Sequence, residues 1–270
     1  MEGRNEVRKS YSMMIGLTLL LICLTACEEQ GQNQSDKQKS QNRVELTLSA
    51  AASLQDVLHE IAATYEKKHP NIKITYNFGA SGALQQQIAQ GAPVDLFFSA
   101  AEDKYDELVK KGFMETKTGT DLLKNELVLI VPANSKLKGF EDLSKTERIS
   151  IGTPESVPAG TYAKETLENL NLWNEIESKI VYAKDVRQVL TYVETGNVDA
   201  GMVYKTDAVN SDKVKIAAAA NEEFHAPIVY PVGVIKNSSH KKEAKAFYEF
   251  LKKEESLKTF EDYGFKRVEN

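Results

Sequence analysis

The stretch "LTLSAAASLQDVLHEIAATYEKK", residues 46–68, joins an apolar strand to an amphipathic helix through a turn of small residues. Ser53 stands in that turn, directly after Ala51 and Ala52. Small side chains let the backbone come close to a neighbouring element or to a ligand. Taken alone, the segment also fits a plain helix N-cap, because Asp56 follows Ser53 by three residues as in a capping box.

The same passage from strand to helix recurs along the chain. Further helix starts are predicted at "FGASGAL", "ESVPAGTYAKE" and "AKDVRQVL", each after an apolar run. Strands that alternate with helices predict an α/β architecture with parallel sheets. Ligands bind such sheets at the carboxyl ends of the strands, where helix N-termini offer free N–H groups and a partial positive charge. Four helix starts, two of them carrying Ser53 and Ser81, therefore predict a site for a small tetrahedral oxoanion.

The first 43 residues predict an exported and anchored protein. Residues 1–26 combine basic residues, an apolar run and a small-residue end, which is typical of a secretory signal peptide. The run ends in "LTAC", which resembles a bacterial lipobox and makes Cys27 the predicted lipidation site. Residues 27–43 are polar and have no large apolar side chain, so we expect a flexible tether. An uncleaved N-terminal anchor is the alternative for the apolar run.

The composition limits the class of function. The whole chain carries a net charge of −5, and residues 27–270 carry −6 because the first 26 residues carry +1. Nucleic acid is not an expected partner, since the protein lacks a bulk positive charge. The only cysteines are Cys23 and Cys27, which excludes disulfides and cysteine sites from the exported domain. The four histidines are scattered and form no metal-binding motif, so no cation site is predicted.

Four segments together resemble the molybdate-binding proteins of ABC transporters. They read "AAASLQDVLHEIAATYEK", "GASGALQQQIAQGAPVDLFFSA", "VPAGTYAKETL" and "AKDVRQVLTYVETGNVDAGMVYKTDA". The resemblance covers almost the whole domain after the tether and implies a two-lobed periplasmic-binding-protein fold of type II. It also implies that hydroxyls and backbone amides of five residues hold molybdate or tungstate between the lobes. These residues are Ser53, Ser81, Ala159, Val186 and Tyr204.

The resemblance also implies lobe limits and partners. The first lobe is expected to comprise residues 44–124 and 231–270, and the second lobe residues 125–230, with a ligand cleft between them and a hinge of two strands. A protein of this family is not an enzyme, needs no cofactor, works as a monomer and delivers its ligand to an ABC transporter permease. With a lipid on Cys27, the expected location is the outer face of the bacterial cytoplasmic membrane.

Three alternatives remain for the function. Sulfate has the charge and shape of molybdate and differs from it in size. Hydrogen phosphate keeps a proton and needs an acceptor, which Asp56 or Asp185 would supply if either pointed into the site, although a helix-start role is preferred for Asp56 and a helix cap for Asp185. A serine hydrolase would use Ser81 as its nucleophile, but Ala83 stands where a nucleophile elbow needs glycine.

Overall fold

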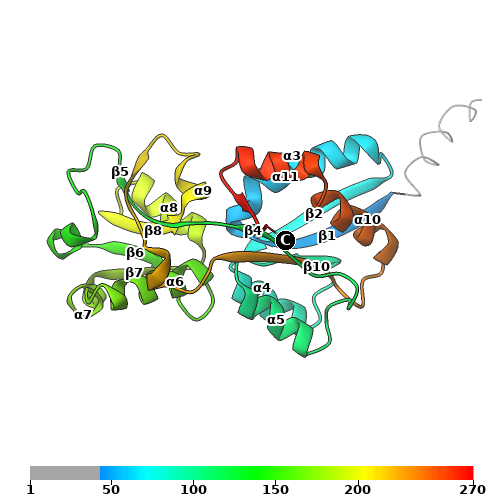
Figure 1. Cartoon of the computed structure of the whole chain (residues 1–270), viewed down its shortest axis with the longest axis horizontal. Coiled ribbons are helices and arrows are strands. Elements are labelled where there is room, and N and C mark those ends of the chain that lie inside the picture. The colour runs from blue at the N-terminus through cyan, green and yellow to red at the C-terminus, as the bar shows by residue number, and fades with distance from the viewer. Residues whose placement is uncertain (1–42, 270) are drawn as a thin grey trace, which may run out of the picture. The chain divides into compact units, whose positions relative to one another are not determined.

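The computed structural model describes residues 43–269, and two β-sheets organise them (Figure 1). The strands of the first sheet are β1 (Val44–Ala51), β2 (Ile72–Gly79), β3 (Leu96–Phe98), β4 (Thr120–Lys124), β10 (Val229–Val234) and β11 (Lys266–Arg267). Their order is β11-β4-β10-β3-β1-β2. β1 pairs in parallel with β2 and β3, whereas β10 runs antiparallel to β3 and β4.

Helices cover both faces of the first sheet. In Figure 1, α3, α10 and α11 lie on one face, and α4 and α5 on the other. α3 buries Leu58, Ile61 and Tyr65, which are apolar residues at helical spacing. This spacing favours a helix and also defines the face of the helix that packs against the sheet. The helices are α3 (Gln55–Lys68), α4 (Ser81–Ala89), α5 (Glu102–Lys110), α10 (Lys241–Leu251) and α11 (Glu254–Asp262).

The second sheet has its own helices. Its strands are β5 (Leu127–Pro132), β6 (Ile149–Gly152), β7 (Ile180–Ala183), β8 (Ala200–Tyr204) and β9 (Val214–Ala219), in the order β7-β6-β8-β5-β9. Figure 1 shows α8 (Val186–Glu194) and α9 (Lys205–Ala208) on one face, and α6 (Pro158–Asn169) and α7 (Trp173–Ile176) on the other. Short 3-10 helices occur at η2 (Ala52–Leu54), η3 (Phe140–Lys145), η4 (Glu177–Lys179) and η5 (Glu222–Phe224).

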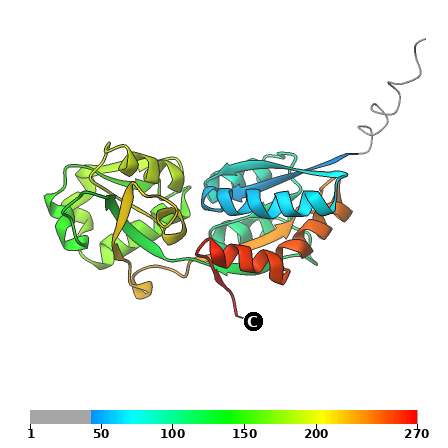
Figure 2. The same ribbon diagram turned by 90° about the horizontal axis from the view of Figure 1, so that it is seen from above.

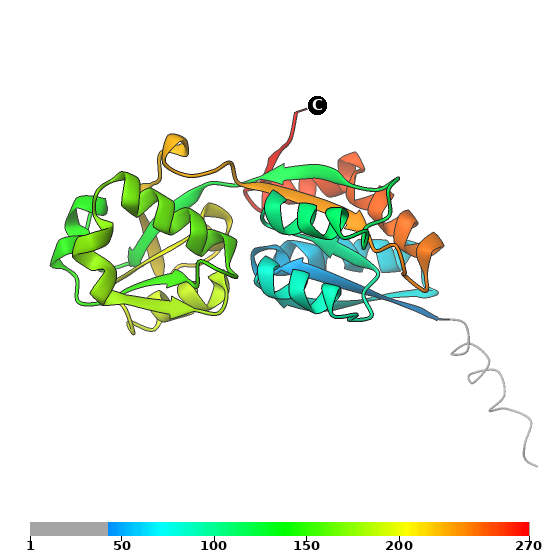
Figure 3. The same ribbon diagram turned by 90° about the horizontal axis from the view of Figure 1, so that it is seen from below.

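The chain passes between the sheets twice, and Figures 2 and 3 show the two connections. Residues 125–126 join β4 to β5, and residues 220–228 join β9 to β10. Tyr230, the last residue predicted for the second lobe, pairs with Leu123 of β4 in the first sheet. Two sheets joined by two crossings confirm the predicted α/β class and the two-lobed type II fold.

The prediction of parallel sheets is wrong in part, because both sheets are mixed. β5 pairs antiparallel with β8 and β9, while β6 pairs in parallel with β7 and β8. The strands that carry the chain from one sheet to the other enter and leave without a crossover helix. A parallel pair of consecutive strands needs a crossover, usually a helix, so direct entry from the other sheet is compatible with the antiparallel direction.

Residues 43–269 include no helix of the length and apolarity that a membrane span requires. The predicted signal peptide, Cys27 and the tether up to residue 42 lie outside the described residues.

Candidate functional site

A small cavity lies where strand ends and helix starts of both sheets meet. Its empty volume, including space open to solvent, is about 210 Å³. We call its two sides the first wall and the second wall. The first wall consists of Ala51, Ala52, Ser53, Gly79, Ala80, Ser81 and Ala100, and the second wall of Val157, Pro158, Ala159, Asp185, Val186 and Tyr204. The structure thus brings all five predicted ligand residues to one small cavity.

Ser53 lies in η2, between β1 and α3, and it does not cap the helix. α3 begins at Gln55 with Leu54 as its N-cap, and no side chain makes the cap hydrogen bond. The Ser53 hydroxyl instead lies 3.0 Å from the Tyr230 hydroxyl, and the Ser53 side chain is buried. The alternative interpretation of Ser53 as a plain N-cap is therefore wrong.

Ser81 is the first residue of α4, and its side chain is fully buried. Its Oγ accepts a hydrogen bond from the backbone N–H of Ala100 at 2.9 Å, and the side chain makes no helix-cap bond. Because the oxygen already accepts a bond, its own proton is left to donate into the cavity.

The second wall offers backbone amides from two helix starts. Ala159 is the second residue of α6, after Pro158, and Val186 is the first residue of α8. Amides at these positions have no acceptor within their helices. α6 comes close to β6 at Gly160, where an added Cβ would lie 2.0 Å from the Gly152 carbonyl oxygen. Only glycine at that position lets the start of α6 reach the cavity.

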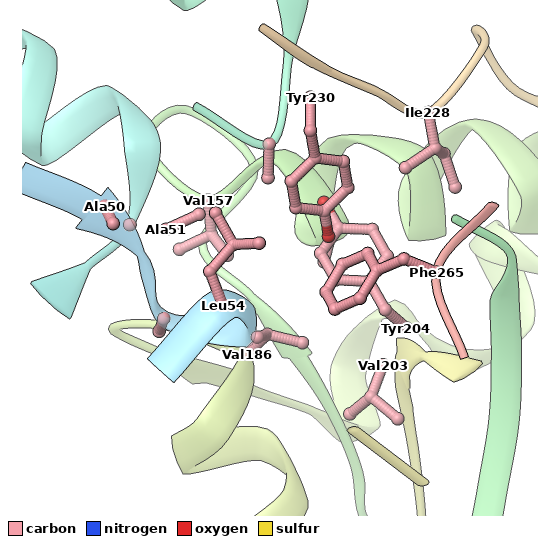
Figure 4. Close-up of a cluster of buried hydrophobic side chains, with 14 of the residues drawn as sticks. Ala50, Ala51, Leu54, Val157, Val186, Val203, Tyr204, Ile228, Tyr230 and Phe265 are labelled. Atoms are coloured by element: carbon pink, nitrogen blue, oxygen red, sulfur yellow. The ribbon is translucent and has the colours of Figure 1, made fainter. Parts of the chain in front are cut away.

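Tyr204 ends β8 and contributes a buried hydroxyl to the second wall. The ring lies 5.7 Å from that of Tyr230, edge to face, and Figure 4 shows the two tyrosines beside Phe265. Within residues 43–269 the Tyr204 hydroxyl has no hydrogen-bond partner. Burial, with a smaller effect from Tyr230, raises the pKa of Tyr204 well above its usual 10, so the hydroxyl keeps its proton and remains a donor.

The two aspartates that would have favoured phosphate are engaged elsewhere. The Asp185 carboxylate accepts from the backbone N–H of Gln188 at 2.9 Å and caps α8, as predicted. Asp56 lies in the first turn of α3, as predicted, and pairs with Arg187 at 3.0 Å. Arg187 therefore forms a salt bridge to the first turn of α3.

Arg187 also lies 3.8 Å from Asp207, which is fully buried on α9. Neither carboxylate oxygen of Asp207 has a hydrogen-bond partner within residues 43–269. Burial raises the pKa of Asp207 to about 7, and this effect outweighs the opposing effect of the Arg187 charge. Asp207 is therefore easier to protonate than an ordinary aspartate.

A direct backbone contact joins the two sides beside the cavity. The N–H of Gly82, on α4, donates to the carbonyl oxygen of Ser156 at 3.0 Å. A Cβ added at Gly82 would lie 2.7 Å from that oxygen, so the glycine sets how closely the two sides approach. The sequence analysis did not identify this role of Gly82.

The sequence analysis also missed Tyr230 and Asn125, which lie behind Ser53. Asn125 donates from Nδ2 to the Tyr230 hydroxyl at 3.2 Å, and Tyr230 contacts Ser53. Along the chain, Tyr230 is 105 residues from Asn125 and 177 residues from Ser53, so local spacing gives no signal for these contacts. Groups of three or more His, Cys, Asp or Glu side chains suited to hold a metal ion are absent from residues 43–269.

Comparison with known proteins places the chain in a family. The chain matches the family of bacterial extracellular solute-binding proteins over residues 46–266. It is 54% identical over 259 residues to the "Putative ABC transporter substrate-binding lipoprotein YvgL" of Bacillus subtilis (strain 168), covering 95% of this chain and 98% of that protein. It is 39% identical over 228 residues to the molybdate-binding protein ModA of Escherichia coli (strain K12), covering 82% and 88% of the two chains.

A solved structure agrees with these relatives. The "substrate binding domain of putative molybdenum ABC transporter from Clostridium difficile" superposes with a TM-score of 0.66 at 49% identity, covering 83% of this chain and 99% of that one. The relatives are solute-binding proteins, which confirms the prediction of a binding protein and not an enzyme. The chain belongs to the family of bacterial extracellular solute-binding proteins.

Proposed function

We propose that this protein captures molybdate or tungstate outside the cytoplasmic membrane and delivers it to an ABC transporter permease. The names of two relatives support this proposal, because one is a molybdate-binding protein and the other a substrate-binding lipoprotein of an ABC transporter. The proposed ligand contacts are the hydroxyls of Ser53, Ser81 and Tyr204 and the amides of Ala159 and Val186, which line one cavity.

The observation that carries the proposal is a cavity built of donors. The Ser81 oxygen already accepts a bond from Ala100, and the Tyr204 hydroxyl has no partner within residues 43–269. The one carboxylate among the lining residues, Asp185, caps its own helix. A fully deprotonated dianion needs only donors. The proton of hydrogen phosphate, in contrast, would face another donor and lack an acceptor. A polar group left unpaired in a buried site costs about 1–3 kcal/mol, which disfavours phosphate.

The cavity holds its anion without a formal positive charge, since none of its lining residues is a lysine or an arginine. Three helices of nine residues or more, α4, α6 and α8, begin at the cavity instead. Their free N–H groups and partial positive charges favour an anion at that point. Local dipoles thereby compensate for the net negative charge of the chain.

Closure of two lobes accounts for capture and release. We assign residues 44–124 and 229–270 to the first lobe and residues 125–228 to the second, because Val229 and Tyr230 pair with β4 in the first sheet. The connections at 125–126 and 220–228 act as the hinge. Hinge closure around a ligand is the usual motion of such proteins, and here neither wall alone supplies all the donors. Because the lobes close around the ligand, the radius of gyration in small-angle scattering should fall on addition of molybdate. We also propose that the protein works as a monomer.

Titration calorimetry with four oxoanions tests the proposed function. Molybdate and tungstate should bind tightly, sulfate more weakly because it is smaller, and phosphate least because it carries a proton. A protein that bound sulfate or phosphate more tightly than molybdate would contradict the proposal.

The membrane anchor is tested separately, because Cys27 lies outside the described residues. Two acyl chains on Cys27 would hold the protein stably on the outer face of the membrane, whereas one chain anchors only marginally. Cys27→Ala should leave an unprocessed precursor without lipid label, and Cys23→Ala should be processed normally. Normal cleavage and lipid labelling of the Cys27→Ala precursor would contradict the lipobox assignment.

A further inference from the structure

A chain of hydrogen bonds reaches Ser53 from the connection between the sheets. Asn125 lies between β4 and β5, and its Nδ2 contacts the Tyr230 hydroxyl at 3.2 Å and Thr206 Oγ1 at 2.9 Å. The Tyr230 hydroxyl lies 3.0 Å from Ser53 Oγ. All four side chains are buried, so water does not compete for these contacts. The chain ends at a residue that lines the cavity.

The direction of the chain follows from its first bond. The backbone N–H of Glu126 donates to Asn125 Oδ1 at 2.9 Å. This bond fixes the amide orientation, because the opposite orientation would set the NH₂ group of Asn125 against another donor. Both protons on Nδ2 therefore point away from Glu126, one toward Thr206 and one toward Tyr230.

The later steps concern the single proton of the Tyr230 hydroxyl. The Tyr230 oxygen accepts a proton of Asn125, and its hydroxyl neighbours are Ser53 Oγ, at 3.0 Å, and the Tyr204 hydroxyl. Burial keeps the proton on Tyr230 by raising the pKa of this residue well above 10. When Tyr230 donates to Ser53, Ser53 Oγ accepts from behind, and its own proton is free to donate into the cavity.

We propose that Asn125 and Tyr230 are positioning residues that hold the Ser53 hydroxyl as an obligatory donor to the bound oxoanion. We call Asn125, Tyr230 and Ser53 the donor relay. This inference rests on the proposed function and extends it, because the relay selects fully deprotonated oxoanions over protonated ones. A serine that already accepts from Tyr230 and donates to the anion is a poorer acceptor for the proton of hydrogen phosphate than a serine without the relay.

Two variants test the direction of the relay. Asn125→Asp has nearly the same shape, but its carboxylate accepts from the Tyr230 hydroxyl, which reverses the bonds and turns the Ser53 proton away from the cavity. Tyr230→Phe removes the middle bond and leaves the Ser53 hydroxyl free to turn. Tyr65→Phe is the matched control, because Tyr65 is buried on α3, away from the cavity lining, and its hydroxyl has no partner within residues 43–269.

The measurement is calorimetry with molybdate and with phosphate at pH 8, where both anions carry two negative charges. An added charge at residue 125 then repels both anions alike, so a change in their ratio reports the direction of the relay. Asn125→Asp should weaken molybdate binding by about a hundredfold and Tyr230→Phe by about tenfold, the scale of one charge-assisted hydrogen bond. Phosphate binding should fall much less or rise, and Tyr65→Phe should leave both affinities unchanged.

Equal losses for the two anions in Asn125→Asp, or no loss of molybdate affinity in either variant, would overturn the relay. Thermal melting without ligand identifies a variant that fails to fold, in which case the other variant decides. The proposed function is judged on the wild-type protein alone. If the wild type preferred sulfate to molybdate, the proposed function would fail, and the same variants would test the relay with sulfate in the place of molybdate.

Discussion

The two walls of the cavity hold their donors in different ways. On the first wall, the hydroxyl oxygens of Ser53 and Ser81 both have polar contacts behind them, with Tyr230 and with the amide of Ala100. On the second wall, the Tyr204 hydroxyl has no hydrogen-bond partner within residues 43–269. The carboxylate of Asp207, three residues further on, lies 3.8 Å from Arg187 but has no hydrogen-bond partner there either. The first wall is therefore arranged before a ligand arrives, whereas the second wall has a buried polar group that only a ligand would satisfy.

Selectivity and closure are therefore divided between the walls. A hydroxyl that accepts from the protein donates to the ligand, so the first wall defines which protonation state of an anion fits. An unpaired buried hydroxyl costs free energy until a partner appears, so the second wall gains more from ligand binding.

The largest effect is expected from a charge on the first wall. Ser81→Asp keeps an acceptor for the Ala100 amide and places an acid in the first turn of α4, where the helix dipole tolerates it. The new charge lies beside a dianion in a site with little water, where like charges repel by several kcal/mol as an order of magnitude. Molybdate binding should disappear in calorimetry while the melting temperature without ligand stays close to that of the wild type.

The control for this charge is Ser239→Asp, which adds the same charge at an exposed residue outside the cavity lining. It should bind molybdate normally. Molybdate affinity close to wild type in Ser81→Asp would remove Ser81 from the site.

The next effect is expected at the contact between the walls. In Gly82→Ala the added Cβ would lie 2.7 Å from the Ser156 carbonyl oxygen, so the two sides cannot approach as closely. Alanine is the better helix former, by roughly 1 kcal/mol, so stability without ligand should not fall. Molybdate should bind about a hundredfold more weakly, and the radius of gyration at saturation should exceed that of the wild type.

Gly79→Ala provides the comparison in the same turn, because its Cβ would reach only an ordinary contact of 3.6 Å with Leu84. Its scattering profile with molybdate should match that of the wild type. A fully closed Gly82→Ala protein would show that the Ser156 contact does not limit closure.

A smaller effect is expected from the second wall. Tyr204→Phe removes a hydroxyl without a partner in the described protein, so stability without ligand should not fall. It also removes one charge-assisted bond to the anion, worth about 1.5–3 kcal/mol, or about tenfold to a hundredfold in affinity. Calorimetry with molybdate measures the loss, and Tyr105→Phe, another buried tyrosine without a partner in residues 43–269, should show none. Unchanged molybdate affinity in Tyr204→Phe would exclude a contact with the ligand.

The smallest effect concerns pH and the buried carboxyl behind the second wall. The pKa of Asp207 is about 7 in the folded protein and 3.8 ordinarily, so the folded state binds the proton more tightly than the unfolded state. The free energy of unfolding should therefore decrease as the pH rises from about 4 to about 7 and then level off. Asp207→Asn should reduce the difference in melting temperature between pH 5 and pH 8. The exposed Asp212→Asn should leave that difference as it is, and an equal difference in wild type and Asp207→Asn would contradict the assignment.

Much of the fold was predictable because its signals are local. The helix start after Ser53 and the apolar periodicity up to Tyr65 appear in the structure as η2 and α3. Two strands were missed for a physical reason. β9 is largely exposed and β4 is short, so neither has the buried apolar run that predicts a strand. The strand directions were also missed, since antiparallel pairing depends on how the chain crosses between sheets.

The helix starts that line the cavity can be read from the chain alone, and family resemblance adds the five residues predicted to bind the oxoanion. Capping, glycine placement and periodicity act over a few residues, so they are visible in a single segment. The surroundings of each hydroxyl depend on the folded structure, because the contacts behind Ser53 and Ser81 come from distant segments. A hydroxyl donates or accepts according to its neighbours in space, and 177 residues separate Ser53 from the tyrosine that contacts it.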